Sequence, residues 1–317
     1  MILTRHRREA GIAVSILLLG AVIAAFAPGY FSLENLNDVA LANLPVLIVA
    51  IGMTLVVLVG EIDISVGSAF AVCGVAAGVI AKLGAPIPVV IAAACAIGGL
   101  LGLLNGTLVA LVRIPSIVVT LAMMVALRDG LRWITQGAWV QDLPPAFQWF
   151  GLSQAAYPWI AGALALLLHV AVTWTMRNVS GARAVYATGS NQEAARIAGI
   201  DTRRVKMCVF AVAGALTGLA AVVNAVRFNQ IPSNSGLGLE MKVIAAVVVG
   251  GAAIRGGSGT FIGTLLGVVL LGAIGPALTF MGVSAYWERA IQGAIILAAV
   301  ALDAAPLRRR ARGVAQA

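Results

Sequence analysis

Histidine, cysteine and charged residues are all scarce in this chain of 317 residues. The two histidines, His6 and His169, argue against a histidine-based metal site or acid–base pair. Cys73, Cys95 and Cys208 lie inside apolar runs without a C-x-x-C spacing, which indicates packing residues and not disulfides or metal ligands. No Walker A sequence occurs, so the chain does not hydrolyse ATP in the P-loop manner. We therefore predict no catalytic residue, no metal and no cofactor.

Apolar residues dominate the composition. They make up 61% of the chain, charged residues make up 10%, and the mean hydropathy is +1.01. Soluble domains are roughly half apolar and a quarter charged, so we predict an all-α, polytopic integral membrane protein whose main solvent is lipid. The net charge of +9 is divided among short segments between apolar stretches. That distribution fits loops beside anionic lipid and argues against a nucleic-acid partner.

About ten apolar segments are predicted to span the membrane. The first could instead be the core of a signal peptide, although the many later segments favour a span. The segment 241–254 is short for a crossing and could be tilted, kinked or re-entrant. The ten segments are 11–27, 39–60, 64–82, 86–112, 115–134, 157–176, 206–226, 241–254, 259–281 and 286–303.

The positions of lysine and arginine predict the orientation. With the N-terminus inside, most basic residues fall on the cytoplasmic side, as the positive-inside rule requires. Both termini are then cytoplasmic. The chain forms one transmembrane domain, 1–317, with a cytoplasmic loop at about 177–206 and an outer loop at about 135–156.

One polar segment, 60–68, interrupts two long apolar stretches. It holds two carboxylates and two hydroxyls, and Ser65 is suited to cap the helix that follows, with Asp63 favouring its positive end. The segment is either a cytoplasmic turn or a broken helix beside a cavity. Polar residues inside spans are candidates for a translocation pathway, although bonding to a neighbouring helix is the commoner fate of such groups. The candidates are Asp63, Ser65, Ser68, Asn105, Thr120 and Asn224.

The cytoplasmic loop contains a short predicted helix. Asn191 is a good N-cap, alanines follow it, and Gly199 can end the helix. Such a helix has little core of its own and would be marginal unless it docks on a partner. The alternative is a helix lying flat on the bilayer beside Arg203 and Arg204. The glycine-rich segment 250–259 follows an apolar helix and is predicted to be a tight turn.

Three stretches together resemble the permease subunits of bacterial ABC importers for monosaccharides, the ribose, xylose, rhamnose and autoinducer-2 group. They are 60–68, 189–200 and 238–259, and the resemblance runs from about residue 40 to 303. The segments 135–145 and 231–242 look closest to the autoinducer-2 branch, with the rhamnose branch next. Glu61 and Arg255 depart from the family pattern, which leaves the sugar undefined.

The resemblance implies a complex of several subunits with different tasks at the bacterial inner membrane. Two permease subunits, identical or paralogous, enclose the pathway, a cytoplasmic ABC ATPase drives it, and a periplasmic sugar-binding protein delivers the substrate. The ATPase-coupling residues would be Asn191, Glu193, Ala194, Ala195, Arg196 and Gly199. The competing hypotheses are a stand-alone secondary transporter or facilitator, and a non-transporting scaffold. An ion-coupled carrier needs intramembrane carboxylates, and the spans offer little beyond Asp63 and Glu61.

Overall fold

The computed structural model describes residues 2–284, 286–295 and 297, and within them it is helical, as the composition predicts. The only β-type pairing in this described part is an isolated bridge between Val140 and Ile231. Residues 286–295 are also helical. The named elements are α1 (Ile2–Phe26), η1 (Pro28–Phe31), α2 (Leu33–Leu58), α3 (Val66–Lys82), α4 (Ile87–Ala110), α5 (Ser116–Thr135), η2 (Gln148–Gly151), α6 (Tyr157–Asn178), α7 (Ser180–Ser190), α8 (Gln192–Ile197), α9 (Thr202–Ala225), α10 (Leu239–Val249) and α11 (Phe261–Phe280).

In the part of the chain that the structure describes, six helices are long and apolar enough to cross a membrane: α1, α2, α4, α6, α9 and α11. They define a polytopic membrane protein. The other four predicted spans differ from them. α3 has 17 residues, α10 has 11, and α5 carries three charged side chains in its C-terminal half. The predicted span 286–303 lies partly outside the described residues, so the count of ten stays a prediction.

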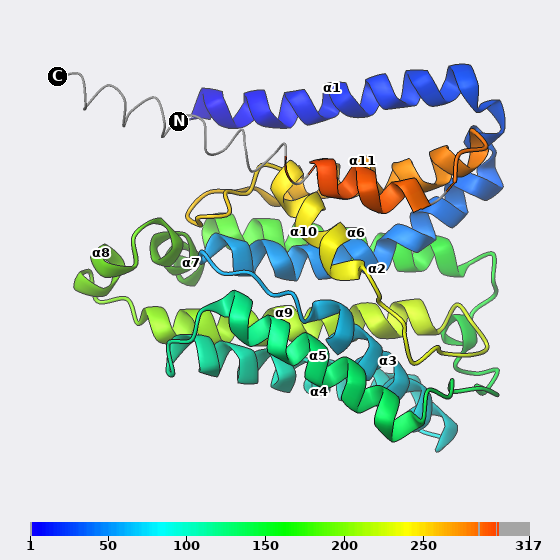
Figure 1. The fold of residues 1–317 in the computed structure, drawn as a ribbon, viewed down its shortest axis with the longest axis horizontal. Coiled ribbons are helices and arrows are strands. Elements are labelled where there is room, and N and C mark those ends of the chain that lie inside the picture. Colours follow the sequence, from blue (N-terminus) through cyan, green and yellow to red (C-terminus); the bar gives the residue numbers. More distant parts are fainter. Residues whose placement is uncertain (1, 285, 296, 298–317) are drawn as a thin grey trace.

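The helices lie side by side, with α7 and α8 at one end of the bundle and the loops after α5 and α9 at the other (Figure 1). α1 runs along one edge, next to α11. α2 is the central helix, and every residue from 45 to 58 is buried. It packs against α6, α9, α10 and α11, so these helices and not lipid surround this stretch.

α4 and α9 form the closest helix pair, and glycine makes this possible. A Cβ on Gly98 would overlap the carbonyl oxygen of Gly214, and one on Gly218 would overlap the carbonyl oxygen of Ala94. Small residues allow membrane helices to approach until their backbones touch. The glycines of the sequence favour close packing at Gly98, Gly99 and Gly102, and the structure shows that Gly98 and Gly102 approach the backbone of α9, whereas a Cβ on Gly99 would make only ordinary contacts.

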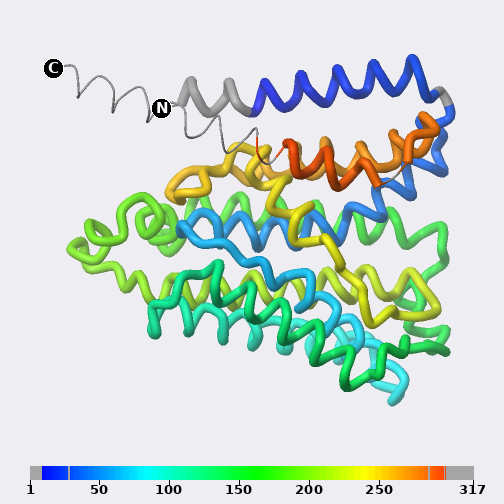
Figure 2. The backbone as a smooth tube through the Cα atoms, in the orientation of Figure 1, coloured from blue at the N-terminus to red at the C-terminus, as the bar shows by residue number. Residues whose placement is uncertain are grey.

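α3 and α10 are half-helices, meaning helices that begin inside the bundle. After α2 ends, the chain turns back as the extended segment 59–65 to the middle of the bundle, where α3 starts (Figure 2). The segment 226–238 enters from the opposite end and leads to the start of α10. The two starts touch, because a Cβ on Gly236 would lie 2.6 Å from the carbonyl oxygen of Gly67.

Candidate functional site

The break after α2 is fixed by the N-terminal half of α5. Gly60 adopts a φ of +81°, a left-handed conformation that glycine accepts readily, and this turns the chain back towards the interior. The amide of Ile62 donates to Ser116 Oγ at 3.3 Å, and Thr120 Oγ1 donates to the Ile62 carbonyl at 3.4 Å. The amide and carbonyl of Ile62 lie outside any helix, and side chains of α5 supply their hydrogen bonds.

Asp63 is the centre of a buried polar network. Its Oδ1 accepts from the amide of Ser65 at 2.9 Å and from the hydroxyl of Ser65 at 2.6 Å. Asn105 Nδ2, from α4, donates to Ser65 Oγ at 2.9 Å. The predicted cap is wrong in one detail: Ser65 occupies the N-cap position, but its side chain makes no capping bond. Ser65 has helical dihedral angles, with a φ of −75° and a ψ of −10°, and its Oγ accepts from Asn105 Nδ2 in place of an amide of the helix.

Five of the six predicted pathway residues gather at this break, and all five side chains are buried: Asp63, Ser65, Ser68, Asn105 and Thr120. Asn224 lies apart from them, in the last turn of α9. The structure therefore joins residues from α3, α4, α5 and the segment 59–65 into one polar cluster. Their part in a pathway remains a proposal.

Two charged residues that the sequence analysis missed lie at the first turn of α3. Arg128 Nε, from α5, donates to Ser68 Oγ at 3.2 Å. Glu240, near the start of α10, packs against Gly67 and is 7% exposed. The sequence held a signal for Arg128, because a charge in the middle of the predicted span 115–134 is costly unless it has a function.

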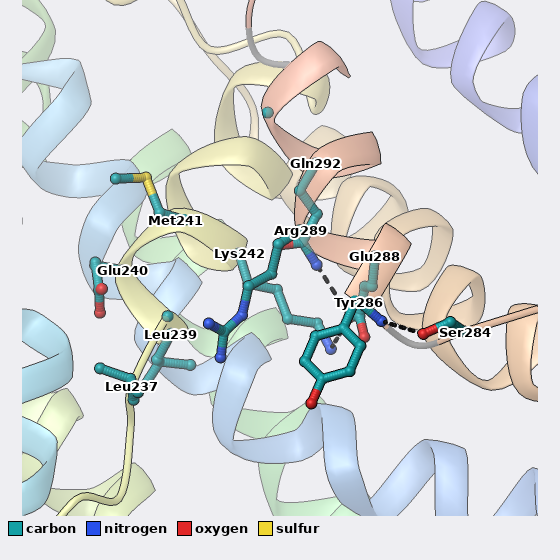
Figure 3. Close-up of a pocket in the computed structure, with 12 residues that line it drawn as sticks. Leu237, Leu239, Glu240, Met241, Lys242, Ser284, Tyr286, Glu288, Arg289 and Gln292 are labelled. Atoms are coloured by element: carbon teal, nitrogen blue, oxygen red, sulfur yellow. Dashed lines mark hydrogen bonds and ion pairs between the residues drawn. The ribbon is translucent and has the colours of Figure 1, made fainter.

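A cavity of about 880 Å³ lies between the start of α10 and the helical residues 286–295 (Figure 3). Arg289 extends from the helical segment towards the start of α10, where a Cβ on Gly238 would lie 3.9 Å from its Nε, whereas Tyr286 is 92% exposed. Lys242 Nζ lies 3.8 Å from Glu288 Oε1, which also accepts from Gln292 Nε2 at 3.0 Å. Two acidic and two basic side chains line the cavity, so their formal charges cancel. The charged lining residues are Glu240, Lys242, Glu288 and Arg289.

The short helix α8 forms as predicted. Asn191 Oδ1 accepts from the amide of Ala194 at 3.0 Å, and Gly199, with a φ of +84°, ends the helix. Ala195 is buried, whereas Ile197 is 79% exposed. Arg196 and Glu193 form an exposed ion pair at 2.7 Å. α8 thus lies at one end of the bundle (Figure 1) with the apolar side chain of Ile197 exposed.

Side chains connect α8 with the break after α2. Lys206, in the first turns of α9, forms an ion pair with Glu61 and a hydrogen bond of 3.0 Å with Gln192 Oε1. The side chains of Lys206 and Glu61 are only 12% and 13% exposed. A polar cleft of about 460 Å³ opens beside this pair, lined by residues of α8, α9 and the α4–α5 connection.

Backbone contacts strengthen the same connection. A Cβ on Gly189, at the end of α7, would overlap the carbonyl oxygen of Leu58. The amide of Gly257 donates to that Leu58 carbonyl at 2.9 Å, and Gly256 packs on Gly60. The glycine-rich segment 250–259 is a turn, as predicted, and it also packs α7 against the end of α2.

A bundle of apolar helices with two half-helices meeting in its interior is the architecture of a membrane transport protein. No cluster suited to a metal ion occurs among the described residues. The family model described as "Branched-chain amino acid transport system / permease component" matches residues 35–300, and the chain belongs to this family. It is a transport permease component and not an enzyme.

Curated relatives cover most of the chain. The autoinducer 2 import system permease protein LsrC of Enterobacter sp. is 36% identical over 296 residues, which cover 93% of this chain and 86% of LsrC. The ribose import permease protein RbsC of Escherichia coli is 33% identical over 298 residues, 92% of each chain. LsrC of Salmonella typhi is 35% identical over 304 residues, 94% of this chain and 86% of LsrC. No solved structure matches.

Proposed function

We propose that this chain is the transmembrane permease subunit of a bacterial ABC importer that carries a monosaccharide or an autoinducer-2-like small sugar across the inner membrane. The observation that carries the proposal is α8, a helix with Ile197 79% exposed, bonded to the broken helix through Lys206. A helix that presents an apolar side chain outside the bundle fits a docking partner. Relatives named as ribose and autoinducer 2 import permeases support the substrate class.

The proposed assembly has four kinds of component. Two permeases, identical or paralogous, enclose the pathway, a cytoplasmic ATPase binds α8, and a periplasmic binding protein delivers the sugar. The coupling residues are Asn191, Glu193, Ala194, Ala195, Arg196 and Gly199. ATP binding in the partner then changes which side of the cavity is open, because α8 contacts the ATPase and, through Lys206, the break at Glu61.

The proposed pathway follows the half-helices. The polar cluster at the break holds the start of α3 in place, and the neutral cavity beside α10 receives an uncharged sugar from the outer side (Figure 3). Its volume lies within the range of small-molecule sites, about 300–1,000 Å³. Balanced charges suit a substrate with no net charge.

Reconstitution tests the proposed function directly. We expect uptake of labelled D-ribose, L-rhamnose or autoinducer 2 by proteoliposomes that contain this chain with its ATPase, its permease partner and its binding protein. Liposomes with the chain alone are expected to show none, because opening of the proposed pathway depends on ATP binding in the partner ATPase. Uptake by the isolated chain would instead support a facilitator.

The proposed topology has ten spans and two cytoplasmic termini, with α8 inside. In a chain without its three native cysteines, a cysteine at Arg196 should react with a membrane-impermeant maleimide only in inside-out vesicles, because its side chain is 69% exposed. A cysteine at Ser153, in the outer loop, should show the reverse pattern. Labelling of position 196 in intact spheroplasts would contradict this orientation.

Ile197 is expected to be a main contact with the ATPase. Replacing Ile197 with Asp should weaken co-purification of the ATPase at least tenfold, because an uncompensated charge buried in an apolar interface costs about 3–5 kcal/mol. Placing the same charge at Ser153, in the outer loop, should leave the complex intact. Equal ATPase recovery from both variants would show that α8 does not dock.

A further inference from the structure

The first turn of α3 is buried, yet its backbone donors have no partners. The first bond of the helix runs from the amide of Ala69 to the carbonyl of Ser65 at 2.9 Å. Among the described residues, the amides of Val66, Gly67 and Ser68 donate no hydrogen bond. Helix starts usually satisfy these groups with a cap, water or a ligand, and a buried start without partners is unusual.

A carboxylate without a partner lies against the same turn. Glu240 is 7% exposed, and its Oε2 accepts no hydrogen bond. A Cβ on Gly67 would overlap that oxygen and lie 2.5 Å from the carbonyl oxygen of Gly236. The carboxylate of α10 is therefore held at the positive end of α3. This placement is electrostatically favourable, but it leaves the Oε2 atom of Glu240 without a hydrogen-bond donor.

A guanidinium with unused donors lies against the neighbouring residue. Arg128 Nε donates to Ser68 Oγ, but Nη1 and Nη2 are buried and have no partner. Burying unsatisfied charged groups costs several kcal/mol unless a function requires them. The first turn of α3 thus lies beside two charged groups: the Glu240 carboxylate, which can accept a further hydrogen bond, and the Arg128 guanidinium, which can donate further ones.

This combination of groups defines the ligand that would fit. The free donors are three amides and the guanidinium, and the free acceptor is the Glu240 carboxylate. An anion would be repelled by Glu240, and a cation by Arg128 and the helix start. A hydroxyl both donates and accepts, so a neutral polyol can satisfy both sets at once.

We propose that Arg128, Glu240 and the first turn of α3 form a binding station for the hydroxyls of a neutral polyol. This inference rests on the proposed function and adds the contact residues. Glu240 also lines the cavity beside α10, at its edge away from Lys242 (Figure 3), so the station adjoins space that a substrate can enter. The contact between Gly67 and Gly236 closes the station in this structure, and separation of the half-helices opens it.

The test uses the full importer in proteoliposomes with labelled D-ribose, L-rhamnose and autoinducer 2 as probes. For the probe that the wild type carries, Glu240→Gln and Arg128→Gln should each lower the ratio of uptake rate to KM by about 10- to 100-fold, since each loses charge-assisted hydrogen bonds. ATPase activity stimulated by the binding protein should persist. Arg132→Gln is the matched control, because Arg132 lies one turn further along α5 and is 62% exposed.

The possible outcomes are distinct. Wild-type KM and uptake rate in both variants would overturn the station while leaving the importer assignment intact. Absence of uptake of every probe by the wild-type complex would instead contradict the proposed function. If the neutral variants do not assemble, Arg128→Lys and Glu240→Asp retain charge but shift the bonding atoms. A raised KM in these two supports the station, and an unchanged KM overturns it.

Discussion

Replacing Lys206 with Met is expected to reduce sugar uptake at least tenfold while the ATPase stays bound and active. Lys206 is the side chain that joins Gln192 of α8 to Glu61 of the break. The substitution removes this connection and leaves the Glu61 carboxylate, 13% exposed, without its cation. Removing one partner of a buried pair costs about 3–5 kcal/mol, and this pair is nearly buried. Uptake and ATPase rates measured on the same proteoliposomes give the ratio that reports coupling.

Two second-site variants distinguish this connection from a general loss of stability. Exchanging the charges, Glu61→Lys with Lys206→Glu, should restore much of the uptake, because the pair can form in reverse. Removing both, Glu61→Gly with Lys206→Met, should harm folding less than Lys206→Met alone, since no orphan charge remains. Arg203→Met, an exposed residue of α9, serves as the control. Full uptake by Lys206→Met would show that coupling follows another route.

Adding one methyl group to Gly98 is expected to prevent normal packing of α4 on α9. The new Cβ would overlap the carbonyl oxygen of Gly214, a backbone atom that cannot rotate away. Overpacking typically costs about 1–3 kcal/mol and sometimes more. We expect Gly98→Ala to lower the thermal midpoint in detergent and the yield of monodisperse protein.

The neighbouring residue provides the control for this prediction. A Cβ on Gly99 would lie 3.6 Å from the carbonyl oxygen of Ala211 and 3.7 Å from the Cβ of Ala215, both ordinary contacts. Gly99→Ala should therefore behave like the wild type, although both changes affect one helix and its propensity equally. If the two variants melt alike, close approach of the backbones does not limit stability here.

The residue pattern alone predicted those features that depend on neighbours in the sequence. Apolar runs predicted the helices, and the asparagine and glycine around 191–199 predicted both ends of α8, because capping involves neighbours in sequence. The polar segment 60–68 predicted an interruption, either a turn or a broken helix, and the structure places it between α2 and α3. Of the predicted pathway residues, five meet at that break, and Asn224 does not, because its distance from the cluster depends on how α9 packs.

The sequence by itself determined that this is a helical membrane protein with a polar interruption at 60–68 and a short capped helix after Asn191, since hydropathy and caps are local properties. Only the tertiary structure decided that α3 and α10 begin inside the bundle and that Glu240 and Arg128 flank one turn. It also decided that Lys206 joins α8 to Glu61. Apart from the bond between Lys206 and Gln192, these contacts join residues 60 to 173 positions apart. Close backbone approach at glycines and the burial of charged groups determine which of these distant residues meet.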